Sequence, residues 1–183
     1  MINESELMLK VKSGELNYLA DLFELNQRPL FNFFSRMGFN DVLSEDFTQE
    51  TFIRVLAYRS SYKPQNTFRA WLYRIARNAV NDHFRKLSNQ DIHVSFNEDL
   101  TTSKDTPTET NERNAKQCNF DKALSSLSME QREIIILSRF QQFRHEEIAE
   151  LLSCNINTLK TRIRAAVSSL KKQYELISGE VTS

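Results

Sequence analysis

The sequence has few residues that break helices: only three glycines and three prolines occur among its 183 residues. This scarcity, together with apolar residues that recur at helical spacing, predicts an all-α protein. No apolar run approaches the ~18 residues that a membrane-spanning helix needs. The first ten residues, MINESELMLK, lack the basic and apolar segments of a signal peptide. We therefore expect a soluble, cytoplasmic protein.

Cysteine and histidine are also scarce. Cys118 and Cys154 lie far apart and neither belongs to a CxxC pair, which argues against a disulfide framework or a zinc site. His83, His93 and His145 are scattered, and HEEIA lacks the second histidine of the HExxH motif. No nucleophile–base spacing and no phosphate-binding glycine loop is present. We predict that the protein is not an enzyme and needs no metal or other cofactor.

The net charge is zero, because 24 basic residues balance 24 acidic ones, but the charges are segregated. Residues 1–58 carry nine acids and five bases, whereas residues 59–86 carry seven bases and only Asp82 as an acid. Residues 87–115 carry six acids and two bases, and residues 153–173 carry five bases and no acid. Two separate basic blocks are typical of a protein that meets a polyanion at two places.

The pattern divides the chain into two small helical domains. The first is predicted at 1–86 and the second at 116–174, followed by a tail at 175–183. Between them, the polar and acidic stretch at 87–115 predicts a flexible linker. We expect helices at 5–12, 16–37, 44–59, 68–85, 118–127, 129–140, 144–152 and 156–172.

Capping residues predict several helix ends in the first domain. Pro29 is expected to kink or interrupt the second helix, and Gly38 to end it. Ser44 is expected to open the third helix, because serine is a favourable N-cap. Residues 60–67 are predicted to form a loop whose last residue, Thr67, caps the next helix.

That next helix, FRAWLYRIARNAVNDHFR, has two different faces. Phe68 and Trp71 are assigned to packing, and Asp82 is expected to pair within the helix with Arg85 or Asn78. Arginines contact phosphates and base edges, and amides read bases, so the polar face suits nucleic acid. A surface helix with a solvated basic face has the same composition. The polar face has i, i+3, i+4, i+7 and i+11 spacing and consists of Arg74, Arg77, Asn78, Asn81 and Arg85.

The second domain ends in a helix-turn-helix pattern. Residues 144–152, RHEEIAELL, predict a short helix, Ser153 and Cys154 a tight turn, and Asn155 the cap of a basic final helix. A three-helix bundle, a repressor, a response-regulator output domain, a transposase arm and a promoter-recognition module all share this pattern. The polar residues at the front of the final helix are Asn157, Thr158, Lys160, Thr161 and Arg164.

Three ordered segments resemble the bacterial sigma-70 family, and within it the extracytoplasmic-function (ECF) group, which keeps only regions 2 and 4 joined by a linker. The resemblance covers residues 5–86 and 118–174. It implies a sigma factor that binds core RNA polymerase and directs promoter-specific transcription initiation. The three segments are SEDFTQETFIRVL (44–56), NTFRAWLYRIARNAVNDHFRK (66–86) and NTLKTRIRAAVSSLKK (157–172).

The resemblance implies partners and site residues for region 2. In the family, the helix with the D-x-x-Q-E-x-F pattern docks on core polymerase, at the β′ coiled coil, with β as a further partner subunit. The matching residues are Asp46, Gln49, Glu50 and Phe52, and Ile53 extends the stripe at helical spacing. A solvated helix face would have the same composition.

The loop at 60–67 and the helix after it resemble the family's reader of the promoter −10 element. The loop would hold a flipped, unpaired base, and the helix would track the melted strand. Candidate loop contacts are Tyr62, Lys63, Gln65 and Asn66, and candidate helix contacts are Arg74, Arg77, Asn78 and Asn81.

The final helix resembles the reader of the −35 element as duplex DNA, through Thr158, Lys160, Thr161, Arg162 and Arg164. The chain departs from the family at two places. Ala165, Ala166 and Val167 stand where relatives commonly carry further arginines, and Ser153 stands where glycine is common. Fewer phosphate contacts imply weaker binding or a shifted footprint.

The resemblance further implies an anti-sigma factor as a partner, which in this family is often anchored in the membrane. The linker would thread the active-centre cleft of the polymerase, although a solvated spacer would have the same composition. The rival function is a self-sufficient repressor, which would bind duplex DNA tightly without polymerase.

Overall fold

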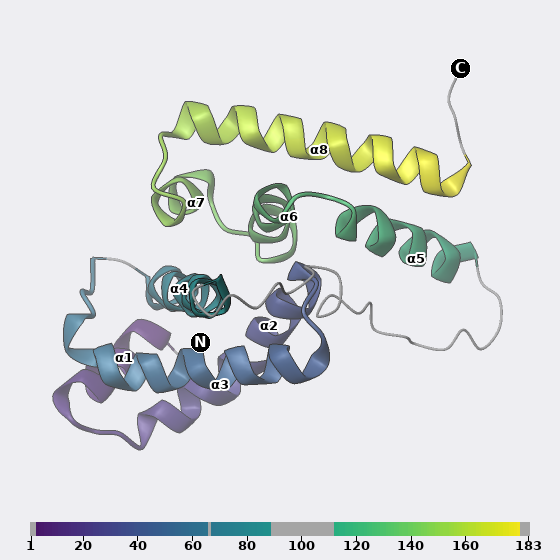
Figure 1. The fold of residues 1–183 in the computed structure, drawn as a ribbon. Coiled ribbons are helices and arrows are strands. Elements are labelled where there is room, and N and C mark those ends of the chain that lie inside the picture. Colours follow the sequence, from purple (N-terminus) through teal and green to yellow (C-terminus); the bar gives the residue numbers. More distant parts are fainter. Residues whose placement is uncertain (1–2, 66, 89–111, 180–183) are drawn as a thin grey trace. The chain divides into compact units, whose positions relative to one another are not determined.

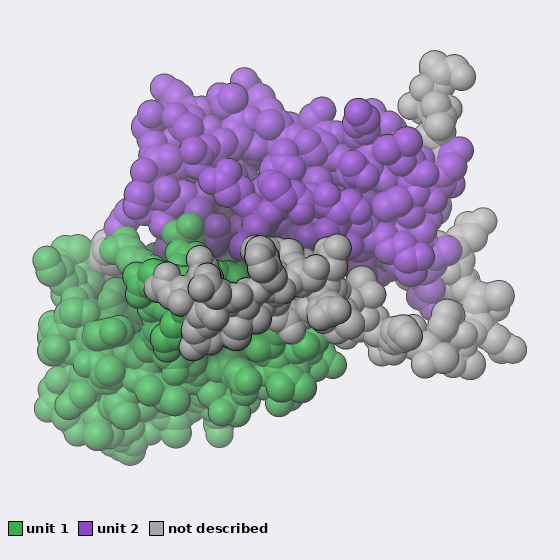
Figure 2. All heavy atoms as spheres, in the orientation of Figure 1, with its two compact units in different colours: residues 1–35, 39–101 green, residues 36–38, 102–183 purple. Residues whose placement is uncertain are grey.

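The computed structural model describes residues 3–65, 67–88 and 112–179, and every regular element in these ranges is helical. The chain divides into two compact units (Figure 2), which confirms the predicted all-α fold of two helical domains. Unit 1 comprises residues 1–35 and 39–101, and unit 2 comprises residues 36–38 and 102–183.

Unit 1 is a bundle whose helix ends follow local capping chemistry. The side chain of Asn3 accepts a hydrogen bond from the Ser5 amide, and Gly14 ends the first helix with φ of 109°. Pro29 lies inside the second helix without interrupting it, and Gly38 follows that helix with φ of 101°. The elements are α1 (Glu4–Ser13), α2 (Tyr18–Met37), α3 (Asp41–Tyr58), the short 3-10 helix η1 (Arg59–Ser61) and α4 (Phe68–Ser88) (Figure 1).

The start of α3 differs from the prediction. Oδ1 of Asn40 accepts a hydrogen bond from the Leu43 amide at 2.9 Å, so the helix begins at Asp41 and not at Ser44. Ser44 lies buried within the helix. Asparagine and serine are equally good N-caps, so the sequence alone does not choose between them. The earlier start places Val42 on the helix.

The two-faced helix, α4, packs its apolar face into unit 1. Oγ1 of Thr67 accepts a hydrogen bond from the Ala70 amide at 3.2 Å and caps α4 as predicted. Phe68 and Trp71 are buried, which confirms that they serve packing. Each fully buried Leu or Phe contributes about 2 kcal/mol. The core around them includes Met8, Val11, Leu22, Leu30, Phe33, Phe34, Val55, Leu72, Tyr73 and Ala76.

Unit 2 carries the helix-turn-helix. Oγ of Ser128 accepts a hydrogen bond from the Gln131 amide at 3.3 Å and caps the second of its helices. The helix predicted at 129–140 changes to a π turn, where the Gln141 amide donates to the Ile136 carbonyl at 2.9 Å. The elements are α5 (Glu112–Ser125), α6 (Met129–Ile135), the π-helical η2 (Ile136–Phe140), α7 (His145–Leu151) and α8 (Ile156–Ser178).

The core of unit 2 is mainly aliphatic and also includes Phe143. Its buried side chains come from all four α-helices and from η2, so each helix presents one apolar stripe to the others. The aliphatic members are Ala123, Leu124, Leu127, Ile134, Ile135, Ile136, Leu137, Ile148, Ala149, Leu151, Leu159 and Ala166.

Several predicted boundaries shift. The helix α4 ends at Ser88 and α5 begins at Glu112, so both overlap the predicted linker at 87–115. The rest of that linker lies outside the described residues. The helix α8 ends at Ser178, so the predicted tail at 175–183 begins as helix. The inward stripe of α8 continues through the half-buried Leu170, Tyr174 and Ile177, which explains the extra turns.

Candidate functional site

The polar face of α4 lies opposite its buried face. Asn78 and Asn81 are exposed, and Arg74 and Arg77 are half-buried. The structure therefore brings all four predicted −10 contacts of this helix to one side. Arginine and amide side chains on one open face provide donors for phosphates and both donors and acceptors for base edges.

Two neighbouring hollows in unit 1 lie along this face. The first has a volume of about 410 Å³ and the second about 400 Å³. Lys63 reaches the first hollow, Gln65 is exposed, and Asn66 lies outside the described residues. The first hollow is lined by Tyr58, Ser61, Lys63, Trp71, Arg74, Ile75 and Asn78. The second is lined by Arg54, Tyr58, Ile75, Asn78, Asn81, Asp82 and Arg85.

Tyr62 is placed differently from the prediction. Its side chain has no exposed surface, and its ring packs against Trp71 with centroids 5.3 Å apart and against Phe68 at 6.3 Å. The structure therefore contradicts its assignment as a base contact, because its ring is part of the core. An aromatic residue in a short loop between two helices carries no periodicity that would reveal its burial.

The first helix holds both ends of this loop. Nζ of Lys12 donates a hydrogen bond to the Tyr62 carbonyl at 2.6 Å, and the Phe68 amide donates to Oγ of Ser5 at 3.3 Å. Met8, on the same helix, is fully buried. This support has no signal in the sequence, because it joins segments fifty or more residues apart without a shared motif.

An ion-pair network joins α3 to α4. Nε of Arg54 contacts Oε1 of Glu50 at 2.7 Å, and its Nη1 contacts Oδ2 of Asp82 at 2.7 Å. Oδ1 of Asp82 accepts a hydrogen bond from Arg85 at 2.8 Å, which confirms the predicted intrahelical pair. Although burial opposes its charge, hydrogen bonds to the two carboxylates raise the pKa of Arg54. The hydrogen bond from Arg54 lowers the pKa of Asp82, and the charge of Arg85 adds to this.

The outer face of α3 carries an exposed stripe of mixed character. Val42 and Ile53 have exposed fractions of 68% and 62%, and Asp46 and Gln49 between them are also exposed. At 100° per residue these four side chains lie within a narrow sector. We call this set the α3 stripe. Val42 was missing from the predicted set because the helix was expected to begin after it.

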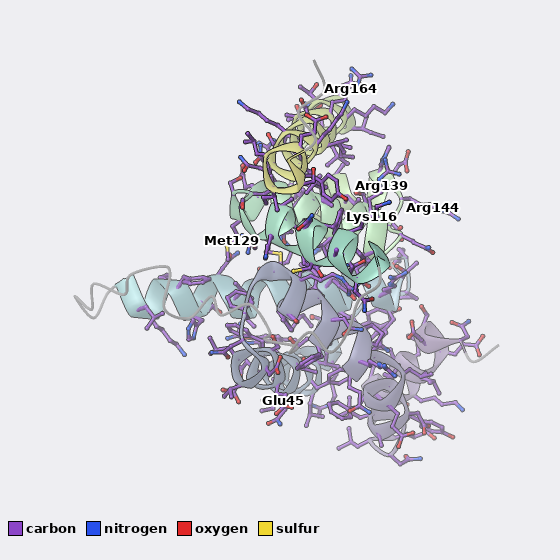
Figure 3. All side chains as sticks on the ribbon, turned by 90° about the vertical axis from the view of Figure 1, so that its right-hand side faces the viewer. Glu45, Lys116, Met129, Arg139, Arg144 and Arg164 are labelled. Atoms are coloured by element: carbon purple, nitrogen blue, oxygen red, sulfur yellow. The ribbon has the colours of Figure 1, made fainter. Side chains whose placement is uncertain are left out.

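Two residues of the predicted docking set lie elsewhere. Phe52 is buried, and its ring meets that of Phe23 at a centroid distance of 5.0 Å, so its role is packing and not contact with a partner. Glu50 is half-buried and is bound to Arg54. The neighbouring Glu45 projects from α3 away from the helices of unit 1 (Figure 3).

The turn of the helix-turn-helix has a defined geometry. The Cys154 amide donates to the Ala149 carbonyl at 2.9 Å, and the Ser153 amide donates to the Glu150 carbonyl at 3.1 Å. These two hydrogen bonds form a Schellman motif, and Ser153 takes the left-handed conformation that the motif requires, with φ of 50°. Oδ1 of Asn155 then accepts a hydrogen bond from the Thr158 amide at 2.8 Å, so Asn155 caps α8 as predicted.

The outer face of α8 is basic and open. Lys160, Thr161 and Arg164 are exposed on the side opposite the buried Leu159. Figure 3 shows Arg164 reaching away from the helices of unit 2. Arg162 is exposed on the flank, and Thr158 is half-buried. The structure thus brings three predicted −35 contacts onto one face and places the other two at its edge.

Fold and surfaces together define a two-domain, all-helical protein that pairs a helix-turn-helix with a second polar helix suited to nucleic acid. The profile described as Sigma-70 region 2 matches residues 22–90, and the profile described as Sigma-70, region 4 matches residues 119–170. The chain belongs to the sigma-70 family and is an ECF sigma factor, a regulatory protein that directs promoter-specific transcription initiation.

Similar proteins support the family assignment over most of the chain. The chain is 30% identical to the RNA polymerase sigma factor YlaC of Bacillus subtilis over 84% of its own length and 90% of that protein. It is 29% identical to the ECF RNA polymerase sigma factor SigW of the same organism, over 92% and 97%. The structure of the sigma factor RpoE from Bartonella quintana, solved with the anti-sigma factor NepR, matches with a TM-score of 0.70 and 27% identity, over 85% and 96%.

None of the helices in the described ranges is both long and apolar enough to cross a membrane. In the same ranges, no three His, Cys, Asp or Glu side chains gather in a way that could hold a metal ion.

Proposed function

We propose that unit 1 docks on core RNA polymerase and holds the melted −10 element, and that unit 2 reads the −35 element as duplex DNA. The observation that carries this is the two-faced helix α4. Its apolar side is buried in unit 1, while its arginine–amide side faces two hollows of about 410 and 400 Å³. Cavities of this size hold small organic groups such as a nucleobase.

The α3 stripe is the proposed contact with the polymerase β′ coiled coil. Val42 and Ile53 offer apolar surface for a partner to cover. Asp46 between them adds a charge that favours a basic partner. Glu50 acts indirectly, because its carboxylate is already engaged by Arg54.

The polar face of α4 is the proposed contact with the unpaired −10 strand. Arg74 and Arg77 supply positive charge for the phosphates, and Asn78 and Asn81 supply amides for the bases. Lys63, on the loop supported by α1, borders the first hollow and is placed to contact a flipped base. Flipping costs a few kcal/mol, which a pocket and stacking offset.

The outer face of α8 is the proposed contact with the −35 duplex. In a helix-turn-helix the second helix enters the major groove with its N-terminal turns, which here carry Lys160, Thr161 and Arg164. The positive N-terminal end of the helix also favours phosphate. Arg162 and Thr158 lie at the edge of this face and are proposed to contact the backbone.

Further partners follow from the family. RpoE of Bartonella quintana was solved in complex with an anti-sigma factor, and we propose that a protein of this class also regulates the present chain. The chain has no catalysis of its own in this proposal, because core polymerase supplies the chemistry. It therefore acts in the cytoplasm, where the polymerase is.

Dependence on core polymerase tests the proposal. The chain alone is expected to bind promoter DNA weakly, and the reconstituted holoenzyme to protect both the −35 and −10 elements in a footprint at physiological salt. A self-sufficient repressor would give a tight, sequence-specific footprint without polymerase. That result would contradict the proposal. Physiological salt weakens sequence-independent phosphate contacts, so a tight footprint by the chain alone would mean sequence-specific binding without polymerase.

A further inference from the structure

Tyr58 is a large exposed side chain that the assignments above leave without a role. It is the last residue of α3, and its exposed fraction is 54%. Tyr58 lines both hollows along α4, and so do Ile75 and Asn78. The hollows are therefore adjacent, and Tyr58 stands at their common edge.

The two hollows differ in their polar groups. The first is bordered by Lys63 and Arg74, which are cationic, and by the edge of Trp71. The second is bordered by Arg54 and Arg85, which are also cationic, and by Asp82 and Asn81. A carboxylate repels the phosphate backbone but accepts hydrogen bonds from N–H groups. Because both arginines are already paired with Asp82, the second hollow offers the N–H groups of a base a carboxylate acceptor that the first hollow lacks.

We propose that Tyr58 lies between two consecutive unpaired bases of the −10 strand, one in each hollow, and that the second hollow selects a base with an exocyclic amino group. This inference rests on the proposed −10 function of α4. It adds a second base-binding hollow and a residue, Tyr58, that stacks on the bases at two adjacent positions.

The chemistry of the second hollow supports an amino-bearing base. Each oxygen of Asp82 accepts one hydrogen bond from an arginine, Oδ2 from Arg54 and Oδ1 from Arg85, so each retains a lone pair. Arg54 lowers the pKa of Asp82, which keeps the carboxylate an acceptor at neutral pH. Adenine and cytosine present an exocyclic N–H₂ donor, whereas thymine presents a carbonyl at that position.

The geometry of Tyr58 supports stacking. An aromatic ring that is half exposed at the edge of a hollow offers a face to a base on either side, and stacking is tolerant of base identity. Selection therefore comes from Asp82 and Asn81, while Tyr58 supplies affinity. Stacking of this kind changes affinity by about tenfold per base.

The test uses holoenzyme made with the full chain and fork DNA that carries a single-stranded −10 segment. An abasic nucleotide is introduced at each position in turn, and affinity is measured by fluorescence anisotropy. With Tyr58 present, an abasic nucleotide at either of two adjacent positions is expected to reduce the affinity for DNA about tenfold. Tyr58→Ala is expected to bind intact DNA about a hundredfold more weakly, about tenfold for each of the two stacked bases, and to lose most of its sensitivity at those two positions. Tyr58→Phe is expected to keep both the affinity and the sensitivity.

Selection is tested by replacing the base at the second position. Thymine is expected to bind about tenfold more weakly than adenine or cytosine, and Asp82→Asn to reduce that difference, with intrinsic fluorescence of Trp71 used to check folding. Sensitivity at only one position, or an equal loss at every position in Tyr58→Ala, would overturn the inference. A different variant tests the proposed function itself. If α4 did not hold the −10 strand, the double variant Arg74→Ala, Arg77→Ala would bind the fork DNA as tightly as the natural chain.

Discussion

Arg54 on α3 donates a hydrogen bond of 2.7 Å to Asp82 on α4, and so joins the helix proposed to dock on polymerase to the helix proposed to hold melted DNA. The same guanidinium binds Glu50 at 2.7 Å. Glu50 matches a family docking position, yet its carboxylate is committed within unit 1. The surfaces proposed for polymerase and for DNA are thus joined by one charged network.

The acid side of this network predicts a pH dependence. The pKa of Asp82 is lowered in the folded protein, so its contribution to stability is present above the ordinary aspartate pKa of about 3.9 and is lost as pH falls through the lower folded value. Urea unfolding followed by Trp71 fluorescence should show stability falling below about pH 4, with a shallower fall in Asp82→Asn.

The matched control for that experiment is Asp21→Asn, which removes an exposed carboxylate from α2. It should leave the acid dependence close to that of the natural chain. An identical pH profile for the natural chain and Asp82→Asn would contradict the role assigned to the Arg54 pair.

The α3 stripe predicts separable effects on docking and stability. Ile53→Asp and Asp46→Ala should each weaken core binding by about tenfold, or about 1.4 kcal/mol, while the thermal midpoint stays unchanged, because both side chains are exposed. Glu50→Ala should lower the midpoint, because it breaks the pair with Arg54. Affinity can be measured by titrating labelled chain with core enzyme.

Glu45→Ala is the matched control, since Glu45 is an exposed acid on the same helix but outside the α3 stripe. It should keep full affinity. If Ile53→Asp bound core polymerase as tightly as the natural chain, the stripe would not be the docking surface.

The left-handed residue in the turn predicts a stabilising substitution. Ser153 has φ of 50° in a Schellman motif, where a side chain is strained and glycine is not. Ser153→Gly should stabilise unit 2 by about 0.5–1 kcal/mol, because relief of strain exceeds the added flexibility of the unfolded chain. Urea unfolding followed by far-UV circular dichroism measures this. Fluorescence of Trp71, which lies in unit 1, should report no change.

The same substitution at Ser168, an exposed position inside α8, should have the opposite sign and cost about 0.5 kcal/mol. A loss of stability at Ser153 equal to that at Ser168 would show that the turn carries no strain.

The basic face of α8 predicts a salt effect. Lys160→Ala with Arg164→Ala should weaken holoenzyme binding to promoter DNA and reduce the slope of log affinity against log salt by about two, one for each lost phosphate contact. Lys171→Ala with Lys172→Ala removes the same charge from the far end of α8 and should leave the slope nearly unchanged. Equal slopes for both double variants would remove the recognition-helix assignment.

Much of this architecture is readable from the sequence because it depends on local rules. The two faces of α4, the cap at Asn155 and the turn at Ser153 all follow from helical period and short-range hydrogen bonds. The early start of α3 does not, because Asn40 and Ser44 cap equally well, and that ambiguity hid Val42.

Burial of side chains was the weaker part of the prediction. Phe52 and Tyr62 match or border family contact positions, yet both are buried against other rings. Whether these side chains are buried depends on packing partners far away in the sequence, and the helical periodicity of a segment does not identify those partners. The same holds for Lys12, whose hydrogen bond to the Tyr62 carbonyl supports the loop at 60–67 from the first helix.

Transcription by reconstituted RNA polymerase most directly tests the proposal that unit 1 holds the −10 element and unit 2 reads the −35 element. Core RNA polymerase with and without the chain would be given a library of genomic fragments, and the 5′ ends of all transcripts sequenced. With the chain, initiation should concentrate downstream of one shared pair of −35 and −10 elements, and Lys160→Ala with Arg164→Ala should abolish that preference. The same start sites without the chain, or no shared element pair with it, would contradict the proposed function.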